Sequence, residues 1–167
     1  MRIGICPGSF DPITIGHEDI IKRAAKIFDK IYVLIAFNSE KKYIFNQNER
    51  IIMCKKVFQD INNIDVVSTT DELVVTYCKN MGINTIIKGL RNNADFEYEM
   101  QIAQVNASVG DEIETFFIPA KPEYSFVSSM VVREIAKYDG DISKFVPKII
   151  LNDIKNKFID LNSDVRK

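Results

Sequence analysis

Short runs of apolar, mainly β-branched residues alternate with segments of helical periodicity through most of this chain. Strands that alternate with helices in this way pair in parallel, and the crossover helices cover both faces of the sheet. The sequence therefore predicts an α/β fold with a doubly wound, five-stranded parallel sheet. The expected strands are Ile3–Cys6, Ile31–Ala36, Ile64–Val67, Thr85–Lys88 and Thr115–Ile118.

The helices expected between these strands carry start and stop signals. The second begins at Asn46, whose side chain can cap the helix, and Glu49 three positions later completes a capping-box pattern. The third is expected from about Asp71 to Met81, with Gly82 as a left-handed C-cap. The others are a helix after His17 with an apolar stripe of Ile20, Ile21, Ala24, Ala25, Ile27 and Phe28, one from Phe96 towards Gly110, one from Ser128 or Ser129, and one opened by Pro147.

Length and composition indicate one domain. The chain has 167 residues, of which 46% are hydrophobic, and this is enough to fill a single continuous core. No repeat, linker or low-complexity tract interrupts the pattern. We expect one domain over residues 1–158 and a polar C-terminal tail over residues 159–167.

The charge balance and the cysteines narrow the class of protein. A formal net charge of −1 gives no global field for nucleic acid, so a local basic cluster must hold any anion. Cys6, Cys54 and Cys78 form no C-x-x-C pair, which argues against a disulfide framework and a structural zinc site. No export signal follows residues 3–6, and the longest apolar stretch, residues 31–37, is far shorter than the roughly 20 residues that cross a bilayer. We expect a cytoplasmic protein with a small-molecule partner.

The loop after the first strand carries the strongest functional signal. In an open parallel sheet, ligands bind beyond the carboxyl ends of the strands, where loops lead into helix N-termini. The run PGSFDPITIGH, from Pro7 to His17, places two glycines, a hydroxyl and an imidazole there, and free backbone N–H groups favour phosphate. His17, the only histidine, could instead cap the helix or pack in the loop. A T-x-G-H pattern after a strand and a small-residue turn is nevertheless the hallmark of the nucleotidyltransferase superfamily.

Cations follow two further strands at the same edge of the sheet. Lys41 and Lys42 follow the second strand, where a lysine can reach an anion, although a solvated pair is the alternative. The run from Lys88 to Arg91 follows the fourth strand, and Gly89 within it lets the backbone approach a ligand closely. Arg91 can offer a planar fork of donors to phosphate, whereas Lys88 supplies a compact charge. We expect phosphate contacts here.

Two later segments have more than one interpretation. The carboxylates of Asp95, Glu97 and Glu99 could bind metal, act in acid–base chemistry or form a polar helix face, and their spacing favours the polar face. The segment 124–129 brings aromatic rings and hydroxyls to a helix start, which suits contact with phosphate or adenine. Capping of the helix by one of its serines is the alternative, and it can coexist with binding.

Together and in this order, these motifs resemble the bacterial phosphopantetheine adenylyltransferase family from Arg2 to about Pro147. The most specific parts are PGSFDPITIGH at 7–17, KGLRNNADFEYEMQ at 88–101 and YSFVSS at 124–129. The resemblance implies a Rossmann-like form of the predicted sheet. It also implies adenylyl transfer from ATP to 4'-phosphopantetheine, giving dephospho-coenzyme A and pyrophosphate in the penultimate step of coenzyme A biosynthesis.

The resemblance implies roles for individual residues. His17 would contact the ATP phosphates and stabilise the transition state, and Ser9 would contact both substrates. Lys41, Val74 and Lys88 would contact phosphopantetheine together with Ser9. The catalytic set would be Ser9, His17, Lys41 and Arg91, and the ATP-binding set would be Ser9, Phe10, His17, Gly89, Leu90, Arg91, Glu99, Tyr124, Ser125, Phe126, Val127, Ser128, Ser129 and Met130.

Two positions depart from the family pattern. Lys88 stands where relatives often have arginine, which keeps the charge but loses bidentate geometry. Met130 replaces a serine common in the family, which removes a hydroxyl contact. The sequence alone leaves open whether either departure alters substrate affinity.

The implied reaction needs no protein nucleophile. The phosphate of phosphopantetheine would attack the α-phosphorus of ATP in line, while Lys41, His17, Lys88 and Arg91 align the two polyanions and neutralise the growing charge. The resemblance implies Mg²⁺ held mainly by the ATP phosphates and water, without a protein ligand. It also implies coenzyme A as a feedback inhibitor and a homohexamer built from two trimers.

Three other functions stay open. A sister nucleotidyltransferase that uses nicotinamide mononucleotide or CTP would share the first loop, although the second and third motifs argue against it. A sensor of adenine nucleotide or coenzyme A would keep the binding loops without turnover. A nucleic-acid-binding domain would need a basic face, which this composition does not indicate.

Overall fold

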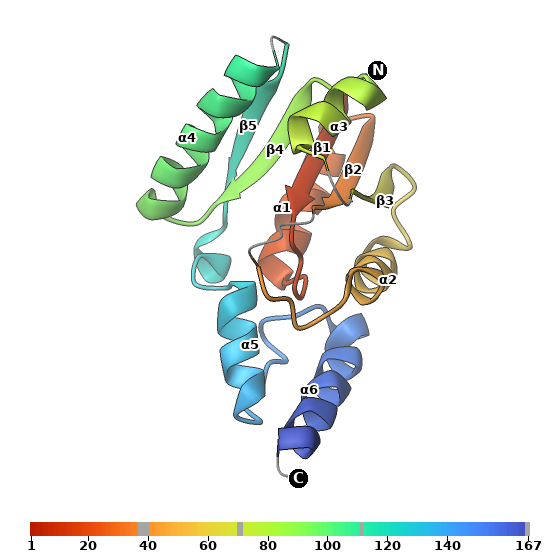
Figure 1. The fold of residues 1–167 in the computed structure, drawn as a ribbon, viewed down its shortest axis with the longest axis vertical. Helices are drawn as coiled ribbons and strands as arrows, with labels where there is room; N and C mark the ends of the chain where they lie inside the picture. The colour runs from red at the N-terminus through yellow and green to blue at the C-terminus, as the bar shows by residue number, and fades with distance from the viewer. Residues whose placement is uncertain (37–40, 70–71, 111, 166–167) are drawn as a thin grey trace.

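One parallel sheet organises the chain (Figure 1). The computed structural model describes residues 1–36, 41–69, 72–110 and 112–165. Within these residues the strand order is β3-β2-β1-β4-β5, and each neighbouring pair is parallel. The predicted doubly wound, five-stranded α/β sheet is confirmed. The strands are β1 (Ile3–Gly8), β2 (Lys30–Ile35), β3 (Ile64–Ser68), β4 (Thr85–Leu90) and β5 (Glu114–Pro119).

Six α-helices and two 3₁₀ turns are found in the described residues. Two predicted helix signals are confirmed, since Asn46 and Glu49 form a reciprocal capping box with bonds of 2.9 and 2.7 Å and Gly82 closes a helix at a φ of 65°. The elements are α1 (Ile15–Ala25), α2 (Gln47–Phe58), α3 (Val74–Met81), α4 (Asn93–Val109), η1 (Pro122–Tyr124), α5 (Ser129–Lys137), η2 (Lys148–Ile150) and α6 (Leu151–Val165).

Several helix boundaries differ from the sequence-based prediction. Helix α1 begins at Ile15, ahead of His17, and Ile27 of the predicted apolar stripe lies beyond its end with 54% of its surface exposed. Helix α3 begins at Val74, and the predicted start at Asp71 lies outside the described residues. Helix α6 continues to Val165, so residues 159–165, predicted as part of a polar tail, are helical.

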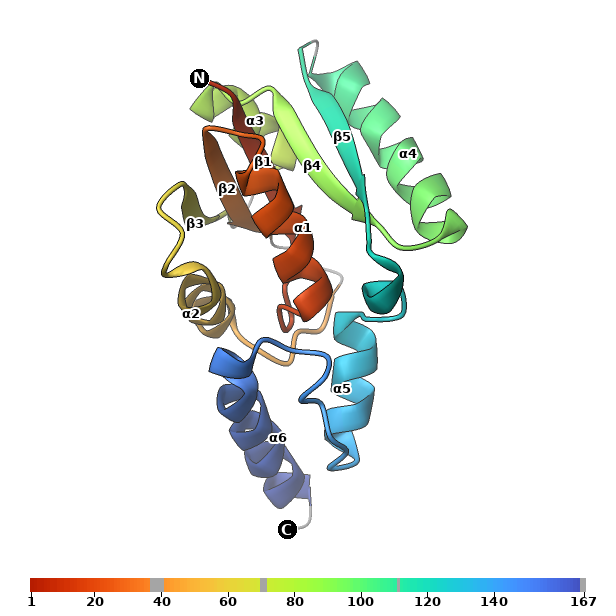
Figure 2. The same cartoon turned by 180° about the vertical axis from the view of Figure 1, so that it is seen from behind.

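Helices cover both faces of the sheet (Figure 2), and an apolar cluster is buried on each face. On one face α1 and α2 pack on the sheet, with Ile21 and Phe58 in the same apolar cluster. On the other face α3 contributes Val75 to a second cluster. Adjacent residues of β1 face opposite ways, since Ile5 belongs to the second cluster and Cys6 to the first, as the alternation of a strand requires.

The last two helices lie beyond the carboxyl ends of the strands, at the end of the molecule opposite the N-terminus (Figures 1 and 2). Val132 of α5 and Ile154 of α6 are fully buried and join the cluster formed by α1 and α2. Helix α5 therefore stands across from the loop that follows β1. No helix among the described residues is long and apolar enough to cross a membrane.

Candidate active site

A cavity of about 800 Å³ opens at the carboxyl ends of β1 and β4. Its walls come from the loop between β1 and α1, the start of α3, one side of α4 and the start of α5. This is the edge of the sheet where ligands of parallel α/β proteins bind. It brings together most residues singled out from the sequence: Ser9, Phe10, His17, Lys41, Val74, Lys88, Gly89, Arg91, Glu99, Val127, Ser128, Ser129 and Met130.

Four residues expected to contact ATP do not line this cavity: Leu90, Tyr124, Ser125 and Phe126. Leu90 is the last residue of β4 and Tyr124 ends the turn η1. The Ser125 hydroxyl donates to the carbonyl oxygen of Pro122 at 2.9 Å. Phe126 is 62% exposed, and its ring makes an edge contact with that of Phe145.

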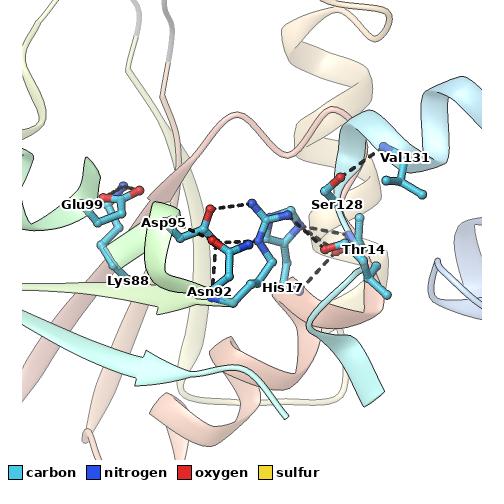
Figure 3. A network of polar contacts seen from close by, with 10 residues as sticks. Thr14, His17, Lys88, Asn92, Asp95, Glu99, Ser128 and Val131 are labelled. Carbon is cyan, nitrogen blue, oxygen red and sulfur yellow. Dashed lines mark hydrogen bonds and ion pairs between the residues drawn. The ribbon is translucent and has the colours of Figure 1, made fainter. Parts of the chain in front are cut away.

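His17 is held by the residue that caps its own helix (Figure 3). The Thr14 backbone N–H donates to His17 Nδ1 at 3.2 Å, and the Thr14 Oγ1 lies 3.1 Å from the same nitrogen. The His17 backbone N–H in turn donates to Thr14 Oγ1 at 3.3 Å. Because Nδ1 accepts, the proton of the neutral ring sits on Nε2. Capping and cavity lining, set out as alternatives from the sequence, therefore occur together in His17.

Burial and nearby cations keep the His17 ring neutral. Burial first, then the charges of Arg91 and Lys88, lower the pKa of His17 from its usual 6.5 to about 4. A neutral imidazole with its proton on Nε2 is a hydrogen-bond donor at neutral pH. It can therefore donate a hydrogen bond to a phosphate oxygen while the ring itself carries no charge.

The loop before α1 holds a strained residue. Phe10 has a φ of 48°, a left-handed conformation that bulky side chains rarely adopt. It is 5% exposed, and its ring meets that of His17 edge-on with centroids 5.2 Å apart. Packing around Phe10 therefore fixes the loop that leads to His17.

Helix α4 pairs with a cation of β4 and with the one directly after it (Figure 3). Lys88 Nζ lies 3.1 Å from Glu99 Oε2 and 3.2 Å from Oε1. Arg91 makes a two-pronged contact with Asp95, from Nε to Oδ2 at 2.7 Å and from Nη2 to Oδ1 at 2.9 Å. Asp95 and Glu99 therefore do more than form the polar helix face that their spacing favoured, because each bonds a cation at or directly after the end of β4.

The Asp95 carboxyl group is ionised in its pair with Arg91. Burial by itself raises the pKa of Asp95, but the hydrogen bonds and charge of Arg91 outweigh it and lower that pKa below its usual value. The carboxylate is therefore ionised at neutral pH. Arg91 Nη1 also donates to the carbonyl oxygen of Val127 at 3.3 Å, which ties the turn after β4 to the segment before α5.

Lys41 contacts the loop between β1 and α1. Its Nζ lies 3.5 Å from Ser9 Oγ, and Lys42 lines the same cavity. The interpretation of this pair as merely solvated is weakened, since both face the cavity. The neighbouring Asn38, Ser39 and Glu40 lie outside the described residues.

The start of α5 uses its serines structurally. Ser128 Oγ accepts from the Val131 backbone N–H at 3.1 Å and caps the helix (Figure 3). Ser129 Oγ donates to the carbonyl oxygen of Pro12 at 2.7 Å. Met130 follows with 69% of its surface exposed. The predicted capping is confirmed, and it presents the first turn of α5 to the cavity.

Away from these polar groups the cavity becomes apolar. The start of α3 and one side of α4 contribute Leu73, Val74, Val75, Ile102, Val105 and Val109. The cavity thus has a cationic end at β4 and an aliphatic end between two helices. Such a shape suits a ligand that has an anionic head and a longer, weakly polar arm.

Sequence analysis missed several residues that hold the site. Asp11, Thr14 and Arg50 are each at most 3% exposed, yet they are polar or charged. Arg50 Nη1 donates to the carbonyl oxygen of Ser9 at 2.8 Å, and its guanidinium lies 4.0 Å from the Tyr43 ring centroid. The T-x-G-H pattern could have identified Thr14, whereas nothing in the sequence marks Arg50 as buried.

The carboxylates of the cavity bear on metal binding. Among residues 1–36, 41–69, 72–110 and 112–165 there is no cluster of three or more His, Cys, Asp or Glu side chains suited to a metal ion. Asp95 and Glu99 are each paired with a cation. This donor set fits a divalent ion that arrives with polyphosphate better than one held by a carboxylate cage.

Known proteins resemble the chain over nearly its whole length. A family model described as cytidylyltransferase-like matches residues 5–135. The phosphopantetheine adenylyltransferase of Lachnoclostridium phytofermentans is 48% identical over 158 residues, covering 95% of this chain and 96% of that protein. The enzyme of the same name from Caldanaerobacter subterraneus is 46% identical, covering 95% of this chain and 98% of that protein.

Solved structures bear out the fold. A Vibrio parahaemolyticus protein, named as a candidate nicotinate-nucleotide adenylyltransferase, superimposes with a TM-score of 0.68 at 16% identity, covering 94% of this chain and 96% of that one. The nicotinic acid mononucleotide adenylyltransferase of Plasmodium falciparum, solved with NaAD, gives a TM-score of 0.63 at 17% identity, covering 96% of this chain and 95% of that one. At this identity the likeness extends to the fold alone, and it agrees with the Rossmann-like sheet expected from the sequence.

Proposed function

The chain belongs to the phosphopantetheine adenylyltransferase family, within the cytidylyltransferase-like group, and on this basis we propose that it transfers the adenylyl group of ATP to 4'-phosphopantetheine. The products are dephospho-coenzyme A and pyrophosphate, and the reaction is a step of coenzyme A biosynthesis. One observation carries the proposal beyond the family. His17, Lys41, Lys88 and Arg91 meet in one cavity at the carboxyl ends of β1 and β4.

The shape of the cavity favours phosphopantetheine over a mononucleotide acceptor. The aliphatic end between α3 and α4, which contains Val74 and Ile102, offers apolar contact but few polar groups for a ribose or pyridine ring. The pantetheine arm is long and flexible, and its phosphate would then reach Lys88 and Lys41. The sequence-based assignment of Val74 and Lys88 to the phosphopantetheine side is part of this proposal.

The reaction proceeds by in-line displacement without a covalent enzyme intermediate. An ionised phosphate oxygen of phosphopantetheine attacks the α-phosphorus of ATP, the bond to the bridging oxygen breaks, and pyrophosphate leaves with that electron pair. The attacking phosphate needs no general base, so the protein contributes alignment and charge stabilisation. His17 donates its Nε2 proton in a hydrogen bond to an α-phosphate oxygen, and Arg91 stabilises the β- and γ-phosphates.

The cations exchange partners when substrates bind. Lys88 and Arg91 are bonded to Glu99 and Asp95 in the free protein, with about a fifth to a third of each side chain exposed. A phosphate group carries at least as much negative charge as one carboxylate and also accepts hydrogen bonds, so it can share or take over the cation. The carboxylates hold the cations in position until then.

Mg²⁺ is the cofactor of this proposal. When bound, it would be held chiefly by the ATP phosphates and water, and it would supply charge neutralisation for the leaving pyrophosphate. The pairing of Asp95 and Glu99 with cations supports this assignment. Arg91 would hold the ATP phosphates that carry the ion.

Location, oligomeric state and inhibition belong to the same proposal. We assign the protein to the cytoplasm, in keeping with three buried, unpaired cysteine thiols. A homohexamer is supported by α4, none of whose residues is buried and on which Phe96 is exposed outside the cavity. Feedback inhibition by coenzyme A follows from the acceptor, since coenzyme A contains the same pantetheine arm.

Pyrophosphate release tests the proposed function. Purified protein with ATP and Mg²⁺ is offered 4'-phosphopantetheine, nicotinic acid mononucleotide or no acceptor, and a parallel reaction replaces ATP with CTP. We expect release only with ATP and 4'-phosphopantetheine together. Release with the mononucleotide would support the sister reaction, and ATP binding without release under any condition would support a sensor.

A further inference from the structure

The loop before α1, the segment after Lys41 and helix α5 meet at one buried residue, Asp11. Asp11 is 3% exposed and lies in the loop between β1 and α1. Its Oδ1 accepts from the Phe45 backbone N–H at 2.8 Å, and its Oδ2 accepts from the Ile44 backbone N–H at 3.1 Å. Those N–H groups directly follow the segment that carries Lys41. Asp11 therefore joins the first loop to the lysine segment.

The same residue is bonded to α5. Arg133 Nη1 donates to the Asp11 carbonyl oxygen at 2.6 Å and lies 3.6 Å from Asp11 Oδ2. One residue further along the loop, the Pro12 carbonyl accepts from the Ser129 hydroxyl at 2.7 Å. Asp11 and Pro12 thus tie the first two turns of α5 to the loop before α1.

Both oxygens of the Asp11 carboxylate are used inside the protein. A substrate phosphate would be repelled by the carboxylate charge, so a direct contact between Asp11 and a polyanion is unfavourable. Because a buried carboxylate is stabilised only by the donors around it, removing the charge or one acceptor should shift those donors rather than leave them in place. The effect would fall on Lys41 and on the start of α5.

We propose that Asp11 is a positioning residue for adenylyl transfer, which sets the alignment of the phosphopantetheine-binding Lys41 segment with the ATP-binding start of α5. This inference rests on the proposed function. Each substrate keeps its own binding groups when Asp11 is changed, but the two reacting phosphates no longer meet in line. A misplacement of about 1 Å can cost on the order of 100-fold in rate.

Asp11→Asn tests the inference, because it keeps the shape while turning one acceptor into an amide donor that faces a backbone N–H. Arg133→Gln is a second variant; its side chain is 32% exposed, so the change is expected to fold. The control is Asp141→Asn. The Asp141 carboxylate also accepts from a backbone N–H, that of Ser143 at 2.9 Å, but in an exposed turn outside the cavity.

The measurements are kcat and KM for both substrates, ATP affinity by calorimetry, and thermal unfolding. We expect Asp11→Asn to lower kcat about 10- to 100-fold and Arg133→Gln about 3- to 10-fold, with KM and ATP affinity within about threefold and Asp141→Asn unchanged. A fall in kcat with intact ATP binding separates alignment from simple loss of folded protein. If Asp11→Asn fails to fold, Arg133→Gln decides by the same criterion.

Other results would overturn the inference. Unchanged kcat in the folded variants would do so, as would raised KM at unchanged kcat, which would make Asp11 part of a binding site. If the unsubstituted protein forms no dephospho-coenzyme A, the proposed function fails and this inference with it. If the unsubstituted protein turns over and the variants match it, the inference alone fails.

Discussion

The two sides of the cavity are held by different kinds of interaction. On the β1 side, Asp11 and Arg50 are buried charges bonded mainly to backbone groups. On the β4 side, Lys88 and Arg91 are partly exposed and bonded to carboxylates of α4. A buried charge cannot reach a substrate in place of its protein partners, whereas a partly exposed cation at the cavity can exchange its carboxylate for phosphate.

The difference suggests a division of roles. The β1 side sets geometry, because the loop around Phe10 and His17 is fixed before any substrate arrives. The β4 side provides adaptable cations for anions of different sizes. Changes on the β1 side should therefore act mainly on kcat, and changes on the β4 side mainly on KM.

The largest effect is expected for His17 on the β1 side. His17→Ala removes the Nε2 donor while leaving the cations of β4 in place, so kcat should fall about 100- to 1,000-fold. KM for ATP should change far less. Steady-state pyrophosphate release measures both constants, and His17→Gln, which keeps a neutral donor, should retain part of the rate. A loss of less than threefold in the alanine variant would contradict the assigned role of His17.

Arg91 tests the β4 side. Arg91→Lys keeps the charge but loses the fork that binds Asp95 and the contact to the Val127 carbonyl, so KM for ATP should rise about tenfold, with a smaller change in kcat. Titration with ATP at increasing salt checks the electrostatic origin.

Arg23→Lys is the matched control for that change. Arg23 bonds Asp19 four residues away at 3.2 Å and the Pro119 carbonyl at 2.8 Å, and it does not line the cavity. This control should leave KM for ATP unchanged. An equal rise in both variants would mean that loss of structure, not of a phosphate contact, explains the Arg91 result.

The pKa of His17 predicts a stability effect in acid. The folded pKa, about 4, is below the usual 6.5, so between these values the unfolded state binds a proton that the folded state does not. The free energy of unfolding should therefore be complete above pH 6.5 and fall as the pH drops towards 4. At pH 5 the loss should be roughly 1 to 2 kcal/mol, less than the full shift implies because the ring borders an open cavity.

Urea unfolding at pH 7 and pH 5 measures this loss, with His17→Gln as the reference that lacks the titrating group. The two proteins should differ in pH dependence only through His17. Because the chain has one histidine, its imidazole resonances also report the pKa directly. A pKa near 6.5 in the folded protein would contradict the buried, neutral ring.

Met130 should give the smallest effect. Its side chain is 69% exposed at the mouth of the cavity. Restoring the family's serine with Met130→Ser adds at most one exposed hydrogen bond, so KM for ATP should fall by no more than about threefold. A tenfold change in KM would show that this position belongs with the substrate-binding groups of the β4 side.

Local chemistry made much of the fold predictable. The capping box of Asn46 and Glu49 and the left-handed Gly82 depend only on residues close by in the sequence, so they could be predicted from it. The placement of His17 near a helix start and of Arg91 directly after a strand followed from the rule that ligands bind at the carboxyl ends of parallel strands. Helix α1 began earlier than expected because Thr14, rather than a residue nearer His17, supplies the cap.

The interactions that hold the site could not be predicted in the same way. Asp11 bonds backbone N–H groups more than thirty residues away, and a backbone donor has no sequence identity to recognise. Arg50 looks like any exposed helix arginine until the fold buries it beneath the first loop. The pairing of Glu99 with Lys88 needs the angle between β4 and α4, which no local pattern supplies.

Transfer of a labelled α-phosphate tests the central claim most directly. ATP carrying ¹⁸O only in the non-bridging positions of its α-phosphate is incubated with the protein, Mg²⁺ and 4'-phosphopantetheine, and the masses of the products are measured by mass spectrometry. We predict that the label appears in dephospho-coenzyme A while the pyrophosphate remains unlabelled. Label in free AMP alone, or no dephospho-coenzyme A at all, would contradict adenylyl transfer to phosphopantetheine.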